Sequence, residues 1–416
     1  MSLVIALSVI AALTAYGVFE KRANDKSLSG IPLRINVNGI RGKSTVTRLV
    51  TSVLAEGGYN VIGKTTGTAA RLLYPDGTEV PIKRKPEGAN IKEQIKCIDK
   101  ASKFGADAMV FECMALKPEY QELVQKDMVR AQVYVVVNVL EDHLDVMGPT
   151  TDDISRVFSK SIPWNGVTIT MPGPHIDVFD RVCRRRHCRL VVANEDNVDP
   201  AFLDKFSYEL FPANAVIAYE VAKTLGIPRG VAEAGMLKAN PDPGALRIVE
   251  VENPHIVFVN GFAANEPSSS IAIWKRMESK GLTKDRVVVL FNGRPDRVDR
   301  TDQFIRDFFP KLPNGTVLVG MGQGLKRLNK AYKKGKYPNL SRYVDMEGKK
   351  AAEVIRLFSS SEFEGSVVLG VGNIHGDAID LIDMMECNDD SMPVLDHQNF
   401  HGVSGLLKGK KWLRRS

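Results

Sequence analysis

Beyond residue 32, short apolar runs alternate along the chain with segments of helical period. Buried strands are predicted by the apolar runs at 33–37, 108–111, 133–139, 167–170 and 190–192. Helices are predicted between several of them, at 44–56, 91–104 and 152–160, and Gly57 and Gly58 supply a stop for the first helix. This alternation favours an α/β fold in which helices cover a parallel sheet.

A second, smaller set of alternating elements follows residue 247. It contains predicted strands at 256–259, 287–291, 317–319 and 367–369, and predicted helices at 270–279, 302–309 and 349–359. The turn Pro-Asp-Pro-Gly at 241–244 marks the junction. We therefore expect a central domain at 33–247, a Rossmann-like C-terminal domain at 248–387 and a basic, irregular tail at 388–416.

The N-terminal run, residues 3–19, carries no charged side chain and is just long enough to cross a bilayer as a helix. No basic residue precedes the run, as one would in a signal peptide, whereas Lys21, Arg22 and Lys26 follow it. The positive-inside rule then predicts a transmembrane helix at 1–20, a polar linker at 21–32 and the remainder of the chain in the cytoplasm. The alternative is a buried core helix.

Composition changes this picture little. The 416 residues carry a net charge of +7, but the tail contributes much of it through Lys408, Lys410, Lys411, Arg414 and Arg415. Without the tail no strong basic footprint remains, so we expect no nucleic-acid partner. The five cysteines are scattered, which favours a reducing compartment over a disulfide framework or a zinc site.

A glycine-rich turn follows the first predicted strand, and it has the residues that cradle a nucleotide's phosphates. The turn and the helix start read Gly39, Ile40, Arg41, Gly42, Lys43, Ser44, Thr45. Backbone N–H groups would hold the phosphates, Lys43 would reach the outer ones, and the Ser44 hydroxyl would ligate Mg²⁺. The spacing is compressed, because the common P-loop has a glycine where this chain has Val37.

Acidic side chains follow two of the other predicted strands. Glu112 comes directly after the strand at 108–111, and the strand at 133–139 leads into Glu-Asp-His-Leu-Asp at 141–145. Because ligands of open α/β sheets bind at the carboxyl ends of strands, these residues should lie near the glycine turn. Ser44 and Glu112 suit Mg²⁺, and His143 is a less usual ligand. The alternatives are a surface acid for Glu112 and a structural histidine for His143.

These motifs together resemble the Mur ligase superfamily of ATP-dependent amide ligases. The resemblance rests on the compressed turn Gly39–Thr45, the Gly-Lys-Thr-Thr-Gly-Thr run at 63–68, Glu112, the run 138–145 and Asn214 before an alanine-rich helix. It is still closer to one branch, the ligase subunit of bacterial poly-γ-glutamate (capsule) synthases. That branch shares the N-terminal apolar segment and the runs at 38–45, 81–86, 141–150, 259–265, 294–301 and 370–376.

The resemblance implies a P-loop ATPase-like central domain of Mur ligase type and a role for each matching residue. Its implied catalytic residues are Lys43, Glu112, His143 and Arg247, and its metal ligands are Ser44, Glu112 and His143. ATP would be held by Gly39–Thr45, Asn214 and Arg247. Substrate would be held by Thr66, Thr68, Lys83, Arg84, Lys85, Asn260, Asn265, Arg297 and His375.

The implied reaction uses ATP and Mg²⁺, with Mn²⁺ as an alternative, to activate a glutamate γ-carboxylate as an acyl phosphate. The implied partners are glutamate, the growing poly-γ-glutamate, the lipid bilayer of a bacterial cell membrane, and integral-membrane subunits for synthesis and export. Self-association into a homo-oligomer stays open. The chain departs from murein ligases at Val157, where many of them have a lysine, and Lys160 lies almost a helical turn away.

Three other functions remain open at this point. The chain could be a membrane-anchored ATPase that regulates capsule export, a scaffold with a vestigial nucleotide site, or a ligase like folylpolyglutamate synthase that adds glutamate to another acceptor. The intact glycine turn, Glu112 and Asp142-His143 argue against the scaffold. The run Asn260–Asn265, altered from the superfamily's aspartate-tyrosine-alanine-histidine signature, leaves the regulator open.

Overall fold

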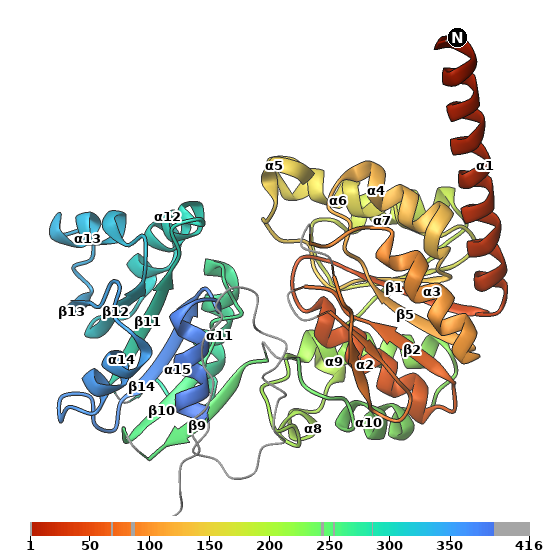
Figure 1. Ribbon diagram of the computed structural model, residues 1–416. Helices are drawn as coiled ribbons and strands as arrows, with labels where there is room; N and C mark the ends of the chain where they lie inside the picture. The colour runs from red at the N-terminus through yellow and green to blue at the C-terminus, as the bar shows by residue number, and fades with distance from the viewer. Residues whose placement is uncertain are drawn as a thin grey trace, which may run out of the picture. The chain divides into compact units, whose positions relative to one another are not determined.

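The computed structural model describes residues 2–67, 70–84, 88–242, 245–252, 254–284 and 286–386. The described chain divides into two compact units (Figure 1). The first comprises residues 1–248 with 259–263, and the second comprises 249–258 with the residues from 264 onward. The α/β fold class predicted from the sequence is confirmed in both sheets.

The first unit contains a mixed sheet of eight strands among the described residues, in the order β4-β3-β2-β5-β1-β6-β7-β8. Strands β1, β2, β5, β6, β7 and β8 run parallel, and β3 and β4 extend one edge in antiparallel fashion. The strands are β1 Leu33–Asn38, β2 Val61–Lys64, β3 Arg71–Leu73, β4 Glu79–Pro81, β5 Ala108–Glu112, β6 Val133–Val136, β7 Val167–Thr170 and β8 Arg189–Val192.

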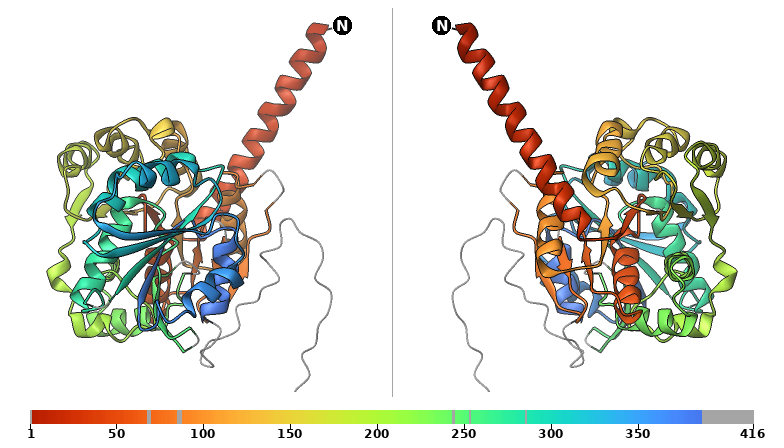
Figure 2. Two further views of the ribbon diagram at one scale, coloured as in Figure 1. Left: turned by 90° about the vertical axis from the view of Figure 1, so that its left-hand side faces the viewer. Right: turned by 90° about the vertical axis from the view of Figure 1, so that its right-hand side faces the viewer.

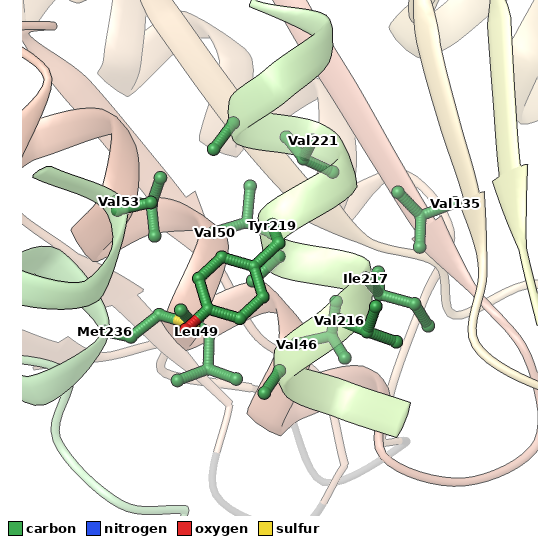
Figure 3. Close-up of a cluster of buried hydrophobic side chains, with 14 of the residues drawn as sticks. Val46, Leu49, Val50, Val53, Val135, Val216, Ile217, Tyr219, Val221 and Met236 are labelled. Carbon is green, nitrogen blue, oxygen red and sulfur yellow. The ribbon is translucent and has the colours of Figure 1, made fainter. Parts of the chain in front are cut away.

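Helices cover both faces of this sheet because strand residues alternate between two apolar clusters. Figure 3 shows one cluster, in which side chains of α2 and α9 meet Val135 of β6 and Met236 of α10. On the other face Met109 and Phe111 of β5 pack with Ile98 of α3 and Val124 of η1. The helices are α2 Lys43–Glu56, α3 Glu93–Phe104, α4 Pro118–Leu123, η1 Val124–Val129 (a π-helix), α5 Leu144–Met147, α6 Thr151–Ser159, α7 Ile176–Arg185, α8 Pro200–Leu203, α9 Pro212–Thr224 and α10 Arg229–Leu237.

Helix α1, Ser2–Ser29, projects from the first unit as one unbroken helix in every view (Figures 1 and 2). The stretch Val4–Ser29 is the one described helix long and apolar enough to cross a membrane by length and composition. The expectation of a polar linker at 21–32 is wrong for residues 21–29, which are helical. Their polar side chains have partners about a hundred residues away, since Asn24 donates to the carbonyls of Asp127 and Met128 at 3.2 and 3.1 Å.

The second sheet, which forms most of the second unit, has six strands among the described residues, in the order β13-β12-β11-β14-β10-β9. Strand β11 lies between β12 and β14 and runs parallel to both. The strands are β9 Arg247–Val251, β10 Ile256–Asn260, β11 Val287–Gly293, β12 Thr316–Gly322, β13 Leu340–Asp345 and β14 Val367–Gly372. The helices are α11 Pro267–Ser279, α12 Val298–Asp307, α13 Lys326–Lys333, α14 Ala351–Phe358 and α15 Asp377–Glu386.

Candidate active site

The register of the first sheet brings the predicted phosphate and metal residues to one edge. Strand β1 lies between β5 and β6 and is parallel to both, with Val37 opposite Glu112 and Asn38 opposite Val136. The segments that leave these three strands are the glycine loop at 39–42, the Glu112 loop and the segment 137–143. Their convergence follows from strand direction, because parallel strands end at the same edge.

Two glycines, together with Asn138 from the segment that follows strand β6, shape the glycine loop. Gly39 and Gly42 have φ values of +128° and +77°, which side-chain-bearing residues rarely adopt. The Asn138 Oδ1 accepts hydrogen bonds from the backbone N–H groups of Ile40 and Arg41 at 3.1 and 3.0 Å. The Asn138 Nδ2 returns a bond to the Arg41 carbonyl at 3.0 Å. Asn138 therefore fixes the compressed loop, a role that its place in the 138–145 motif did not reveal.

Asn214 lies directly against this loop. A Cβ atom added at Gly42 would come within 2.8 Å of the Asn214 Oδ1, so glycine is required there for space as well as for its φ value. Asn214 itself is buried, in the first turn of α9. The sequence predicts Asn214 as an ATP-binding residue, and this role stays a prediction; the structure places the residue beside the glycine loop.

The Lys43 ammonium bends back over the loop. Its Nζ donates to the carbonyls of Gly39 and Ile40 at 2.7 and 3.0 Å. Burial lowers the pKa of Lys43, and the nearby negative charge of Glu112 opposes that change. A positive charge held at the start of α2, where helix N–H groups also point outward, makes this edge attractive to phosphate.

Glu112 is the buried acid at the centre of the site. Its Oε2 accepts from the Ser44 hydroxyl at 2.9 Å and from the Thr66 N–H at 2.7 Å, and its Oε1 accepts from the Thr66 hydroxyl at 2.6 Å. The carboxylate is 3% exposed. Three loops therefore meet at one carboxylate, a convergence that explains how Thr66 enters the site.

The Ser44 hydroxyl and the Glu112 carboxylate form an oxygen pair that fits Mg²⁺. Among the described residues no group of three or more His, Cys, Asp or Glu side chains could hold a metal ion alone. Mg²⁺ is usually bound by one or two protein oxygens together with nucleotide phosphates and water, so the pair is sufficient for that ion.

A cavity of about 260 Å³ opens beside this cluster. Lys43, Thr66, Arg84, Cys113 and His143 line it, together with the glycine loop and residues 114–116. His143 has a φ of +52° and directly precedes α5. Its backbone N–H donates to the Asp142 Oδ1 at 2.8 Å, while the Asp142 Oδ2 pairs with Arg41 at 3.1 Å. The Arg41–Asp142 ion pair was not predicted from the sequence.

A buried charge network supports the loop that carries Thr66. Lys64, the last residue of β2, is fully buried and its Nζ lies 2.9 Å from the Glu93 Oε1. Arg84 contacts the same carboxylate at 2.7 Å and donates to the Gly67 carbonyl at 2.5 Å. The hydrogen bonds from Arg84 and the charge of Lys64 outweigh the effect of burial and lower the pKa of Glu93. Of these three residues the sequence predicted a role only for Arg84, as a substrate contact.

The remaining predicted residues fall elsewhere. Thr45 lies in the first turn of α2 and Lys83 is exposed. Thr68, Lys85 and the tail at 388–416 lie outside the described residues. In the second sheet Arg247 begins β9, Asn260 ends β10, Asn265 precedes α11, Arg297 precedes α12 and His375 follows β14.

The carboxyl edge of the second sheet has its own polar cluster. The Asn292 Nδ2, at the end of β11, donates to the carbonyls of Asn373 and His375 at 2.6 and 2.9 Å. Burial lowers the pKa of His375, and the positive charges of Arg294 and Arg300 lower it further. Asn292 and the two arginines were not predicted as site residues. Arg294 also forms a two-point ion pair with Asp296, and the negative charge of Asp296 opposes the lowering of the His375 pKa.

The chain is similar in sequence to two known capsule and polyglutamate proteins and in fold to a solved protein structure. The sequence model of the family described as Poly-gamma-glutamate synthase CapB C-terminal domain matches residues 245–388. The Capsule biosynthesis protein CapB of Bacillus anthracis is 44% identical over 376 residues, which cover 90% of this chain and 80% of that protein. The PGA synthase CapB of Bacillus subtilis (strain 168) is 44% identical over 384 residues, which cover 92% and 96%.

A solved structure of E. coli FolC in complex with DHPP and ADP resembles the fold, with a TM-score of 0.62 and 16% identity. The alignment covers 88% of this chain and 92% of that chain. The likeness confirms the predicted fold type of a parallel-sheet central domain followed by a smaller α/β domain.

Proposed function

Because the chain belongs to the CapB family of poly-γ-glutamate synthases, we propose that it is an ATP-dependent ligase that links glutamate units through amide bonds. The observation that carries this proposal is the arrangement at Glu112. One buried carboxylate holds the Ser44 hydroxyl and the Thr66 loop next to Lys43 and the glycine loop. That arrangement provides a phosphate cradle, a fixed positive charge and two oxygens for a divalent cation.

The reaction requires activation because a carboxylate has no good leaving group. In the proposed first step a γ-carboxylate oxygen attacks the terminal phosphorus of ATP, the bond to ADP breaks, and an acyl phosphate forms. In the second step the amine of another glutamate attacks the acyl carbon, loses a proton, and inorganic phosphate leaves. The charge that spreads over the transferring phosphoryl is offset by a positioned cation and by backbone N–H groups.

The residues of this chain would divide that work. Lys43 would turn from the carbonyls of Gly39 and Ile40 to the outer phosphates, where an anionic ligand favours its charged form. Ser44 and Glu112 would hold Mg²⁺, or Mn²⁺ as a substitute, and the ion would neutralise phosphate charge. Arg84, which lines the same cavity, would contact the activated carboxylate or the polymer, and His143, also in its lining, would serve as a further metal ligand.

In the second unit His375, with Arg294 and Arg300 near it, would contact the glutamate carboxylates, as would Arg297 and Asn265. Asn260, which belongs to the first unit, stays a predicted substrate contact. Arg247 and Asn214 would contact the nucleotide. The exposed apolar part of α1 would anchor the chain in the cell membrane with the two units in the cytoplasm. Integral-membrane subunits for polymer export would then be its partners.

The test measures phosphate release and polymer together. Full-length protein in membranes receives ATP and Mg²⁺ with and without glutamate, and the products are analysed for γ-linked glutamate. We expect glutamate-dependent phosphate release and a γ-linked polymer. Lys43→Met should abolish both, whereas Lys103→Met, an exposed lysine on α3, should change neither. Glutamate-independent hydrolysis without polymer would instead identify a regulatory ATPase, and a single added glutamate would identify a ligase for another acceptor.

A further inference from the structure

Helix α1 is joined rigidly to the first unit. Its last turns pack on α3 and η1, with Leu28 buried, and four polar contacts at residues 20–25 hold these turns against the unit. Lys21 contacts Asp127 at 3.8 Å, Asp25 contacts Arg130 at 2.6 Å, and Glu20 contacts Lys92 at 3.2 Å. The fourth contact is Asn24 on the carbonyls of η1. Because α1 is one unbroken helix that is held at residues 20–28, its apolar part has a fixed direction relative to the sheet.

That direction is toward the carboxyl edge, where the candidate site lies. Helix α3 begins at this edge, since Glu93 contacts Lys64 at the end of β2, and it ends at the opposite edge, shortly before β5 begins. Residues Tyr16 and Glu20 of α1 lie beside Lys92 at the start of α3, and Gly30 lies beside Ser102 near its end. The apolar residues before Tyr16 therefore extend beyond the edge that carries the glycine loop. Figure 1 shows the N-terminal part of α1 projecting past α3.

The same edge exposes apolar side chains near α1. Leu116, Tyr120 and Leu123 are 37%, 41% and 37% exposed, and the Lys117 Nζ lies 5.9 Å from the centre of the Tyr120 ring. Helices α4 and η1 are continuous and run in the same direction as α1, because Lys21 and Asp25 meet Asp127 and Arg130 in turn. Tyr120 and Leu123 then lie roughly one to two helical turns beyond Asp127, level with the last apolar turns of α1.

We propose that α1 is a rigid strut that holds the carboxyl edge of the first sheet against the bilayer, with Leu116, Tyr120 and Leu123 resting in the lipid interface. These three side chains with Lys117 are called the edge patch below. Leu116 also lines the cavity beside Lys43 and His143, so the cavity opens at the membrane surface. A polymer made there would leave the site where an exporter in the membrane could receive it. This inference rests on the membrane anchoring proposed above.

The partner that covers the apolar side chains of α1 and the edge patch is lipid, because the exposed apolar side chains of α1 have no preferred side. Val4, Ile10, Leu13 and Phe19 are 66%, 59%, 66% and 73% exposed and are distributed around the helix. A helix that is apolar all round fits a membrane, whereas a helix that docks in a protein groove has one apolar stripe. A tyrosine and a lysine next to leucines are typical of the membrane interface. Glu119 and Glu122 are also exposed on α4, so the contact depends on apolar burial and not on net positive charge.

The test compares two labelled positions in full-length protein in vesicles of phosphatidylethanolamine and phosphatidylglycerol. Lys117→Cys lies on the edge patch, and Lys103→Cys lies at the far end of α3, roughly 16 Å from Lys92 along the helix. Each is made with Cys387→Ser, since Cys97, Cys113, Cys183 and Cys188 are buried. A fluorescent label on each cysteine is challenged with lipids that carry a quencher on the headgroup.

We expect the label at position 117 to be quenched several-fold more than the label at position 103. Inserting Gly-Ser-Gly-Ser between Phe19 and Glu20 should reduce this difference while the protein still floats with the vesicles. Equal quenching at both positions, or stronger quenching at 103, would overturn the proposed orientation. A difference unchanged by the insertion would overturn the strut. Flotation of the native chain tests the anchoring separately, and glutamate-dependent phosphate release tests the ligase.

Discussion

Replacing Glu93 with glutamine should destabilise the first unit much more than replacing its partner Lys64 with methionine. Lys64 is fully buried and is paired with Glu93. Its other polar contact among the described residues is a weak one, to the Met114 Sδ at 3.6 Å. Glu93 would keep Arg84 at 2.7 and 3.2 Å if Lys64 were removed. The two variants differ because Glu93→Gln leaves the Lys64 ammonium buried without a charged partner, whereas Lys64→Met leaves Glu93 paired with Arg84.

The stability lost in Glu93→Gln is set by the Lys64 ammonium, which the substitution leaves buried without its carboxylate. Breaking a buried ion pair from one side costs about 3–5 kcal/mol. An unpaired ammonium can instead release its proton, which at pH 7 costs about 4–5 kcal/mol for an ordinary lysine, so the loss is capped near that figure. Lys64→Met should cost less than about 2 kcal/mol, because the hydrogen bonds to Arg84 remain. The double variant should lie within about 2 kcal/mol of the native chain.

The assay is hydrogen exchange of the amides in β2 and α3, read by mass spectrometry in detergent. A loss of 3–5 kcal/mol corresponds to a fall in protection of roughly 100- to 5000-fold, since about 1.4 kcal/mol is tenfold. Lys103→Met on the same helix is the matched control and should leave protection unchanged. A Glu93→Gln loss below about 1 kcal/mol, or a double variant as unstable as Glu93→Gln, would refute the reasoning.

Acid should remove the contribution of Glu93 in the native chain. Its pKa is lowered in the folded state, so the stabilisation is complete above the ordinary glutamate pKa of about 4.3 and is lost as pH falls through the lower, folded value. Protection in β2 should therefore fall below pH 4 in the native chain and change less in Glu93→Gln. Equal acid sensitivity of the two would contradict this assignment.

Two further outcomes concern the candidate site. Glu112→Gln keeps the shape but loses the charge, so kcat/KM for glutamate-dependent phosphate release should fall on the order of 100-fold; a variant with native Mg²⁺ dependence would remove Glu112 from the metal site. Gly42→Ala places a Cβ 2.8 Å from the Asn214 Oδ1 and should weaken ATP binding at least about tenfold in a titration, a loss of about 1.4 kcal/mol. Gly58→Ala shares a positive φ, +89°, but has open space around it, so ATP affinity should stay native; equal losses would show that only backbone strain matters.

The sequence predicted the parts of this molecule that depend on local pattern. The strands β1, β5 and β7 lie within one residue of the predicted runs. Strand β5 is an apolar run that ends at Glu112, and β1 and β7 alternate apolar and polar residues. The glycine loop, Glu112 and His143 meet because strand direction alone brings them to one edge. Strand β6 ends earlier than predicted, at Val136, since Asn138 turns away to bind the glycine loop. Periodicity contains no signal for that turn.

What the sequence did not predict depends on partners far along the chain. Residues 21–29 have a linker's composition, yet they stay helical because Asn24 and Asp25 find partners at residues 127–130. Lys64 and Glu93 look like surface charges until the fold buries them together. In each case the prediction for a polar residue depended on its neighbours in the sequence. The contribution of that residue to stability depends instead on a contact with a residue far along the chain.

At the carboxyl edge of the first sheet, the glycine loop, the Thr66 loop and α1 are each held by side chains from other segments of the first unit. A shorter glycine loop has fewer backbone groups to satisfy its own N–H donors, and Asn138 of the next segment accepts from two of them instead. The Thr66 loop is likewise held from outside, by Arg84 and Glu93 at the start of α3. The residue before Glu93 is Lys92, which contacts Glu20 of α1. The helix that we place in the membrane thus packs on the same turn of α3 that supports the Glu112 loops. If α1 is anchored in lipid, the position of the candidate site relative to the bilayer is set by packed side chains and not by a flexible tether.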